Sequence, residues 1–196
     1  MNAAFVARME DVLAVYARLH DARLPVVCFD ERPCFLLGNV VEGLAPQPAG
    51  AGQPGQPAKA HYAYSKHGRG CLVAAVEPLT GQRLYQLRRQ RPKRAYTQFR
   101  QQLAARSPQA EKIRLVQDTL NTHALSRFYS CLPAAMAHPL AARFELYYTP
   151  KCGSWLNQME LDFSALSRQC LQRRIPPKRN WPTRCLPGLG NARRSG

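Results

Sequence analysis

Acidic side chains occur at three separated points of the chain where folding could bring them together. Asp118 comes at the end of an apolar, partly β-branched run (residues 113–116) of the kind that fills a buried strand, and Asp30 follows a similar run. Glu160 lies in a predicted helix over residues 154–171. An Asp at a strand end also starts turns and caps helices, so one such residue alone indicates little. Three acids on three different elements are what a metal-dependent phosphoryl-transfer centre requires.

Hydrophobic periodicity predicts the elements that must position these acids. The order is helix, strand, hairpin, helix, strand, helix, strand and helix, which predicts an α/β fold with a mixed sheet and helices on both faces. Apolar runs predict strands that end at Asp30 and Asp118, and a further apolar piece that extends or pairs with the first strand. Before Asp118, the remaining elements are a helix over 2–20, that apolar piece over 33–41, a hairpin within 62–87 with its turn at 78–81, and a helix over 96–106. After Asp118 come helical segments over 121–132 and 134–143, interrupted at Pro133 and Pro139, and a strand over 144–148.

The last helix carries two acids with different expected surroundings. Its apolar stripe has Glu160 at one edge, from which the carboxylate can turn toward the sheet. Asp162 is expected on another face, in solvent. Ser154 is the expected N-cap.

The length of 196 residues suits one domain that buries roughly 70% of its unfolded surface. We expect a lead-in helix over 1–20, a catalytic domain over 21–175 and a basic tail over 176–196. Residues 45–58 are rich in Pro, Gly and Gln, which predicts an inserted surface loop rather than a domain boundary. The prolines and glycines of the tail predict disorder there.

The charge balance indicates a polyanionic partner. There are 28 Lys and Arg against 12 Asp and Glu, a formal charge of +16. The excess is uneven, because the segment from Arg83 to Arg114 contains a single acid, Glu111. Nucleic acid is the partner that such a surface favours, and general solubility is the alternative. The run of residues 88–94 is expected to contact DNA phosphates without reading sequence, through Arg88, Arg89, Arg91, Lys93 and Arg94.

Cysteine usage bears on the compartment. The seven cysteines form no Cys-x-x-Cys pair and no Cys/His zinc spacing. An odd count without an evident secretory leader favours the reducing cytoplasm. No apolar run approaches the roughly 20 residues that span a bilayer, so no membrane segment is expected.

Three sequence blocks resemble a known family. They read Val-Cys-Phe-Asp-Glu (27–31), Val-Gln-Asp-Thr-Leu-Asn-Thr-His (116–123) and Tyr-Tyr-Thr-Pro-Lys-Cys-Gly-Ser-Trp-Leu-Asn-Gln-Met-Glu-Leu-Asp-Phe (147–163). Together they resemble the catalytic core of bacterial insertion-sequence transposases of the Tc/mariner superfamily. The resemblance covers about residues 9–175 and implies an RNase H-like fold, a mixed five-stranded sheet flanked by helices. It also implies a DDE triad made of Asp30, Asp118 and Glu160.

The implied reaction is cleavage and joining of DNA strands with no covalent protein-DNA intermediate. Carboxylates in such centres hold two divalent ions about 4 Å apart. Mg²⁺ suits hard oxygen ligands, and Mn²⁺ is expected to substitute. Without a cation, two ionised carboxylates about 5 Å apart repel by roughly 3 kcal/mol at an effective dielectric constant near 20. The implied partners are transposon ends and target DNA, with a homodimer on paired ends.

Residues around the triad have open roles. Glu31 either supports Asp30 or faces away, since adjacent strand residues point to opposite sides. Asn121 and His123 belong to the loop after Asp118, where His123 either contacts phosphate or is structural. Asn157 either steadies the Glu160 helix or caps it.

The chain departs from the family at three places. The family usually has Asn directly after the second Asp, where this chain has Thr119. Family members carry an N-terminal helix-turn-helix region, whereas a short helix precedes the first strand here, and the tail replaces an expected helix. A truncated or frameshifted copy accounts for both ends. The alternatives to an active transposase are a catalytically silent DNA-binding remnant and a cellular RNase H-like nuclease.

Overall fold

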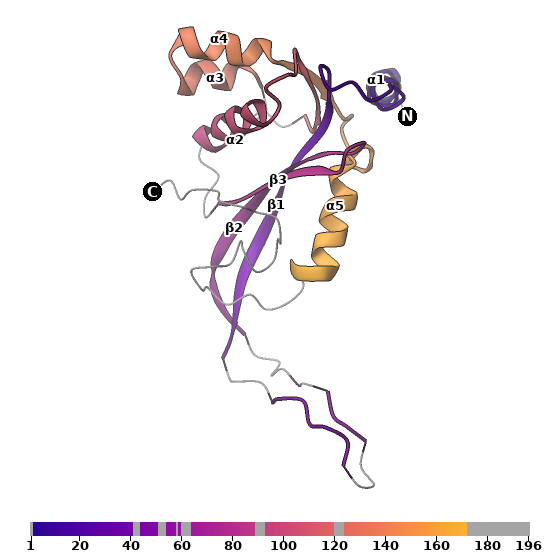
Figure 1. Ribbon diagram of the computed structural model, residues 1–196, viewed down its shortest axis with the longest axis vertical. Coiled ribbons are helices and arrows are strands. Elements are labelled where there is room, and N and C mark those ends of the chain that lie inside the picture. Colours follow the sequence, from indigo (N-terminus) through magenta and orange to yellow (C-terminus); the bar gives the residue numbers. More distant parts are fainter. Residues whose placement is uncertain are drawn as a thin grey trace.

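A mixed five-stranded sheet organises the protein (Figure 1). The computed structural model describes residues 2–40, 44–50, 54–57, 59, 64–88, 93–119 and 124–171. The strand order is β3-β2-β1-β4-β5, antiparallel from β3 to β1 and parallel from β1 to β5. The predicted mixed sheet is therefore confirmed. The strands are β1 (Val26–Asn39), β2 (Tyr64–Glu77), β3 (Gln82–Arg88), β4 (Ile113–Gln117) and β5 (Phe144–Tyr148).

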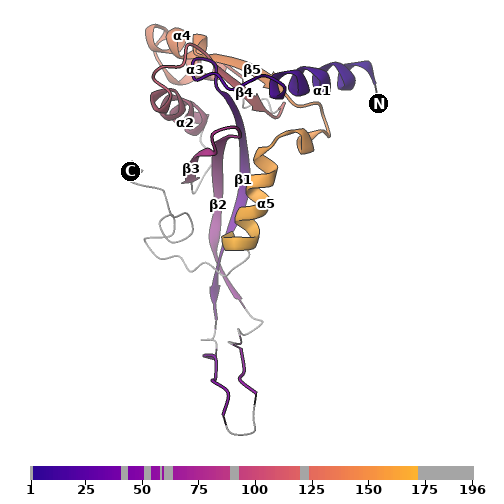
Figure 2. The same ribbon diagram turned by 45° about the vertical axis from the view of Figure 1, so that its right-hand side comes forward.

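Helices cover both faces of this sheet (Figure 2). On one face lie α1 (Ala3–Tyr16) and α5 (Met159–Leu166), and on the other lie α2 (Lys93–Arg106), α3 (Ser126–Cys131) and α4 (Ala134–Ala142). Each face has its own core, because successive strand residues point to opposite sides. Cys28 packs in the cluster with the α1 and α5 side chains, and Phe29 packs in the cluster with those of α2 and α3.

The first strand is longer than the sequence indicates. The apolar piece expected at 33–41 extends the same strand, so Asp30 lies within β1 and not at its end. What ends near Asp30 is the pairing with β4, whose last pair is Cys28 with Val116. Beyond that point β1 is paired only with β2, and this pairing continues through a bulge between Phe35 and Leu37. The carboxylate therefore lies where a neighbouring strand stops.

The predicted helix over 154–171 is three separate pieces. Ser154–Leu156 is a 3-10 turn, α5 is a regular helix, and Ser167–Leu171 is a π-helical turn. Ser154 does not cap α5, because the chain turns again at Asn157 before α5 begins. In α4, Pro139 lies inside the helix without interrupting it, whereas the predicted break at Pro133 is confirmed.

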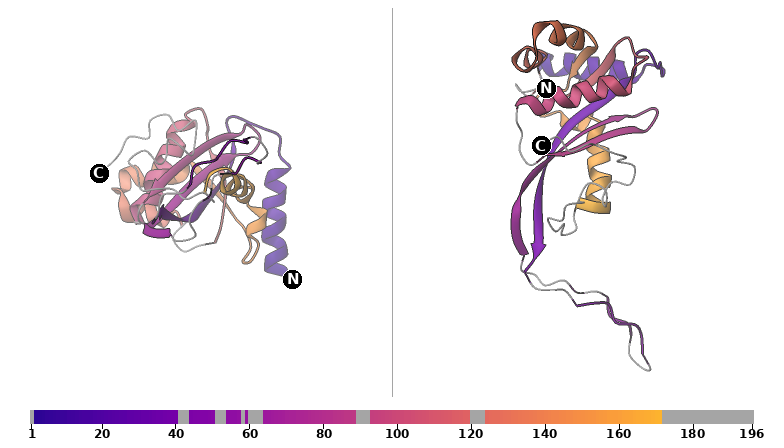
Figure 3. Two further views of the ribbon diagram at one scale, coloured as in Figure 1. Left: turned by 90° about the horizontal axis from the view of Figure 1, so that it is seen from below. Right: turned by 60° about the vertical axis from the view of Figure 1, so that its left-hand side comes forward.

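A narrow two-stranded extension leaves the body of the protein (Figure 3). The β1–β2 ribbon runs beyond the helical layers. Among the described residues between 44 and 59, bridges join Leu44 to Lys59 and Gln47 to Gln56. The segment expected as an inserted surface loop thus carries some backbone pairing. The predicted tail, 176–196, lies outside the described residues. In the part of the chain that the structure describes, no helix combines the length and apolar character needed to cross a membrane.

Candidate active site

A cleft of about 340 Å³ brings the three predicted acids together. Asp30 reaches it from β1, Asp118 from the segment that follows β4, and Glu160 from the first turn of α5. One further carboxylate, that of Glu31, and one guanidinium, that of Arg32, also line it. The remaining lining residues are Pro33, Thr149, Ser154, Asn157 and Phe163.

Strand register explains why the two aspartates meet. In the parallel β1–β4 pair, Cys28 lies opposite Val116, and both belong to the core beneath α1 and α5. Continuing the same register by two residues brings Asp30 level with Asp118. Because side chains alternate with a period of two, both carboxylates emerge on the face that α5 covers. The backbone N–H of Glu31 donates to Oδ1 of Asp30 over 2.7 Å, which holds that carboxylate in place.

Asn157 holds the start of α5 against the sheet. Its side chain is 1% exposed, and its Nδ2 donates to the carbonyl of Phe29 over 2.9 Å. Its Oδ1 accepts a hydrogen bond of 3.2 Å from the backbone N–H of Met159. Of the two roles that the sequence left open, Asn157 therefore has the first: it steadies the start of α5 against β1, whereas the N-cap position is Gln158. Glu160, whose side chain is exposed, follows one turn later.

The segments after β4 and β5 are joined beside the cleft. The Thr119 hydroxyl donates to the Thr149 carbonyl over 2.8 Å, and the Thr149 N–H donates to the Gln117 carbonyl over 2.9 Å. Arg8 of α1 also donates to the Thr119 hydroxyl, over 3.4 Å. Thr119 thus orders the segment that carries Asp118 with its hydroxyl group, at the position where the family usually has an amide.

The other predicted site residues fall into two groups. Glu31 lines the cleft and accepts a long contact of 3.9 Å from the Cys71 thiol. Asn121, His123, Arg89 and Arg91 lie outside the described residues, as does the side chain of Lys93.

The two described arginines of the predicted DNA-binding run differ in their surroundings. Arg88 is half-buried, donates to the side chains of Gln86 and Gln98, and has its pKa lowered by burial. Arg94 is exposed near the start of α2. Arg94 is therefore the more available of the two for a phosphate.

The donor chemistry of the cleft fits a hard divalent cation, since its carboxylates provide the oxygen ligands that Mg²⁺ and Mn²⁺ prefer. Among the described residues, no three His, Cys, Asp or Glu side chains lie close enough together to form a finished metal site. The carboxylates therefore surround the cleft without converging.

Two residues near the site escaped sequence reasoning. Asp162 is buried, 9% exposed, and accepts from Arg83 Nε over 2.8 Å and from the Tyr85 hydroxyl, so the expectation that it is solvated is wrong. The spacing contained the signal, because Asp162 lies three residues after Met159 on the buried stripe of α5. Arg32 donates to the Phe163 carbonyl over 3.4 Å, with its guanidinium carbon 5.9 Å from that ring's centre.

Comparisons with known proteins bear on the family and on the fold. The model of the DDE superfamily endonuclease family matches residues 25–180. The crystal structure of the Mos1 strand transfer complex is similar with a TM-score of 0.54 and 14% identity, over 94% of this chain and 53% of that one. The Mos1 transposase paired-end complex with left transposon end has a TM-score of 0.37 and 16% identity, over 84% of this chain and 56% of that one. No curated protein sequence matches. The chain spans about half the length of these Mos1 chains, and the first of them shows that the fold is RNase H-like.

Proposed function

The chain belongs to the DDE superfamily endonucleases, and we propose that within this family it is the catalytic core of a DNA transposase. The proposed reaction is metal-dependent cleavage of DNA followed by strand transfer. The observation that carries the proposal is the meeting of Asp30, Asp118 and Glu160 in one cleft, from a strand, a strand end and a helix. Members of the family generally use divalent metal ions.

In this proposal Asp30, Asp118 and Glu160 hold two Mg²⁺ ions, for which Mn²⁺ substitutes. The chemistry supplied by the bound cations is activation of a water or a DNA 3′-hydroxyl and stabilisation of the leaving oxygen. Glu160 completes the ligand set by turning its exposed carboxylate inward from a helix that Asn157 fixes to β1. Arg32 offers the positive charge of the cleft to a neighbouring DNA phosphate.

The proposed partner is DNA, both transposon ends and target. Support comes from the formal charge of +16 and from the exposed Arg94 beside the run 88–94. One structural neighbour is named as a strand transfer complex. For this chain we propose that two copies act together on paired transposon ends. We further propose that the chain comes from a bacterial insertion sequence and acts in the cytoplasm.

Nicking of supercoiled plasmid with Mg²⁺ or Mn²⁺ tests the reaction. We expect activity in the unaltered protein, loss in Asp118→Asn and Glu160→Gln, and retention in Glu111→Gln. Glu111 is a matched control because it is an exposed carboxylate that pairs with Arg23 and does not line the cleft. Circular dichroism confirms equal folding of the variants.

The three possible results separate the candidate functions. Nicking that depends on both acids and on transposon-end sequence supports the transposase. Nicking that depends on the acids but is indifferent to ends assigns the chain to cellular nucleases. A folded protein that binds DNA but gives no nicking with either metal contradicts the proposal and leaves a DNA-binding remnant.

A further inference from the structure

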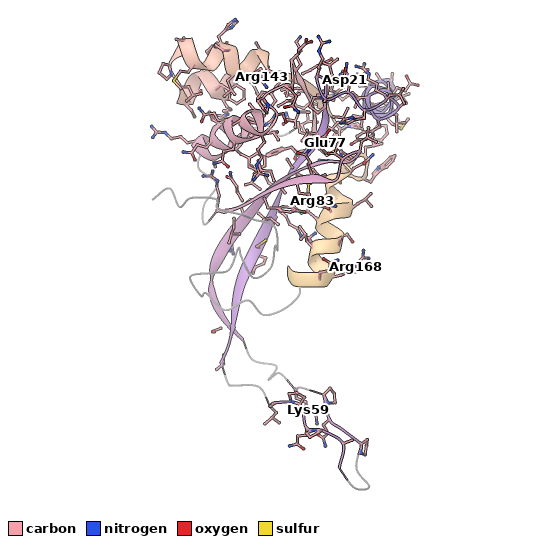
Figure 4. The ribbon with its side chains drawn as sticks, in the orientation of Figure 1. Asp21, Lys59, Glu77, Arg83, Arg143 and Arg168 are labelled. Carbon is pink, nitrogen blue, oxygen red and sulfur yellow. The ribbon has the colours of Figure 1, made fainter. Side chains whose placement is uncertain are left out.

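Asp162 is a buried carboxylate that the proposed reaction does not use. It lies on α5 two residues after Glu160, and both of its oxygens accept hydrogen bonds from β3. Arg83 donates to Oδ1 from Nε over 2.8 Å, and the Tyr85 hydroxyl donates to Oδ2. Figure 4 shows Arg83 between the sheet and α5. A carboxylate removed from water needs such partners, so this contact is a fixed point of the helix.

The donors are themselves held in place. Arg83 Nη1 donates to the Gly81 carbonyl over 2.8 Å, within the turn that joins β2 to β3. Arg106 of α2 donates to the Arg83 carbonyl over 3.1 Å. Tyr85 is buried in the core beneath α1 and α5. The two side chains that bind Asp162 therefore belong to the sheet, and their positions do not depend on that of α5.

The direction of this contact determines where Glu160 points. The helix packs on β1 and β2, with β3 to one side and β4 to the other. Successive helical residues are about 100° apart around the axis, so Glu160 and Asp162 point roughly 200° apart. With Asp162 held toward β3, Glu160 is directed to the opposite side, where β4 ends and Asp118 lies.

We propose that Asp162 is a positioning residue: bonded to Arg83 and Tyr85, it fixes the rotation of α5 about its own axis and thereby keeps Glu160 on the cleft. This inference rests on the proposed function for its consequence, which is cation affinity. Its structural part, the anchoring of α5, stands on the hydrogen bonds alone. Asn157 fixes the start of the helix on β1, and Asp162 fixes its rotation from β3.

The protein contains a chemically matched control. On β5, Glu145 accepts from the Tyr147 hydroxyl over 2.6 Å and forms an ion pair of 3.5 Å with Arg114. This is again one carboxylate with one tyrosine and one arginine, but none of the three lines the cleft. Glu145→Gln and Tyr147→Phe therefore make the same chemical changes as Asp162→Asn and Tyr85→Phe at a place that does not line the cleft.

Two measurements on the full chain test the inference. Hydrogen exchange read at the amides of residues 159–166 reports the anchoring of α5. Binding of Mn²⁺, followed by the electron paramagnetic resonance signal of the free ion, reports the consequence without requiring catalysis. We expect Asp162→Asn to lose protection in α5 and to raise the Mn²⁺ dissociation constant about tenfold, with Tyr85→Phe changing both in the same direction, and the two control variants to stay within about twofold.

Each result has one meaning. Unchanged α5 protection in Asp162→Asn and Tyr85→Phe overturns the anchoring, whatever the protein does with metal. Lost protection with unchanged Mn²⁺ affinity overturns the link from Asp162 to Glu160. Absence of Mn²⁺ binding from the unaltered protein contradicts the proposed metal centre, while the exchange data still decide whether Asp162 holds α5.

Discussion

Replacing Asn157 with Ala should destabilise the protein by about 3 kcal/mol. The side chain makes two hydrogen bonds in a buried position, to the Phe29 carbonyl and from the Met159 N–H. Each is worth about 1 kcal/mol net, and losing the donor at a buried carbonyl adds about 1 kcal/mol. Asn157→Asp should cost at least as much, because it keeps the acceptor for Met159 but turns a negative oxygen toward the Phe29 carbonyl.

Urea unfolding followed by far-ultraviolet circular dichroism measures this loss as a change in midpoint at constant slope. Gln158→Ala is the matched control, since Gln158 is the next residue and its hydrogen bond to the Tyr16 hydroxyl comes from the backbone. We expect that control to change the free energy of unfolding by about 0.5 kcal/mol or less. A loss of about 1 kcal/mol or less in Asn157→Ala would refute the idea that this side chain joins α5 to β1.

Three further perturbations give defined outcomes. Asp118→Asn removes one of the four carboxylates that line the cleft, so the gain in thermal stability that Mn²⁺ gives relative to EDTA should vanish. Cys152 has a φ of 63°, and Cys152→Gly should raise stability by about 0.5–1 kcal/mol in urea unfolding; a loss would contradict strain there. Burial raises the pKa of the Cys28 thiol from 9.0 to about 11. The unfolded state therefore releases its proton first, and stability should fall by about 2 kcal/mol as pH rises from 9 to 11. Cys28→Ala should reduce that loss in a chemical-denaturation pH series and also lessen the loss from Tyr16, whose pKa is raised by burial and by its contact with Cys28.

Much of the fold could be predicted from the sequence because its signals are local. The apolar runs at 113–116 and 144–148 lie on β4 and β5, and the turn at 78–81 separates β2 from β3. Asp118 could be assigned to a strand end for the same reason, since a charged residue follows a buried run directly. The order of these elements then restricts the sheet to a mixed arrangement with helices on both faces.

The errors occur where a partner distant in sequence decides the outcome. The pairing of β1 with β2 from Cys28 to Asn39 continues the strand past Asp30, and no local feature of residues 25–31 shows that continuation. The surroundings of Arg100 also depend on the folded sheet, because it is fully buried among the rings of Phe29, Tyr96 and Phe144. Burial lowers its pKa to about 10, and its position in a basic segment gives no local sign of that burial.

The same reasoning separates the two acids of α5. Periodicity alone put Glu160 at the edge of the apolar stripe and left Asp162 in solvent, although Asp162 has the spacing of the buried stripe. A carboxylate at such a position is buried only where hydrogen-bond donors are placed to pair with it. For Asp162 these donors are Arg83 and Tyr85, which lie 79 and 77 residues earlier in the chain. The acid expected to do chemistry is therefore exposed, and the acid expected to be idle is held by the core. A site of this kind can be found from sequence at its exposed carboxylates, but the contacts that aim them depend on strand pairings that only the folded sheet provides.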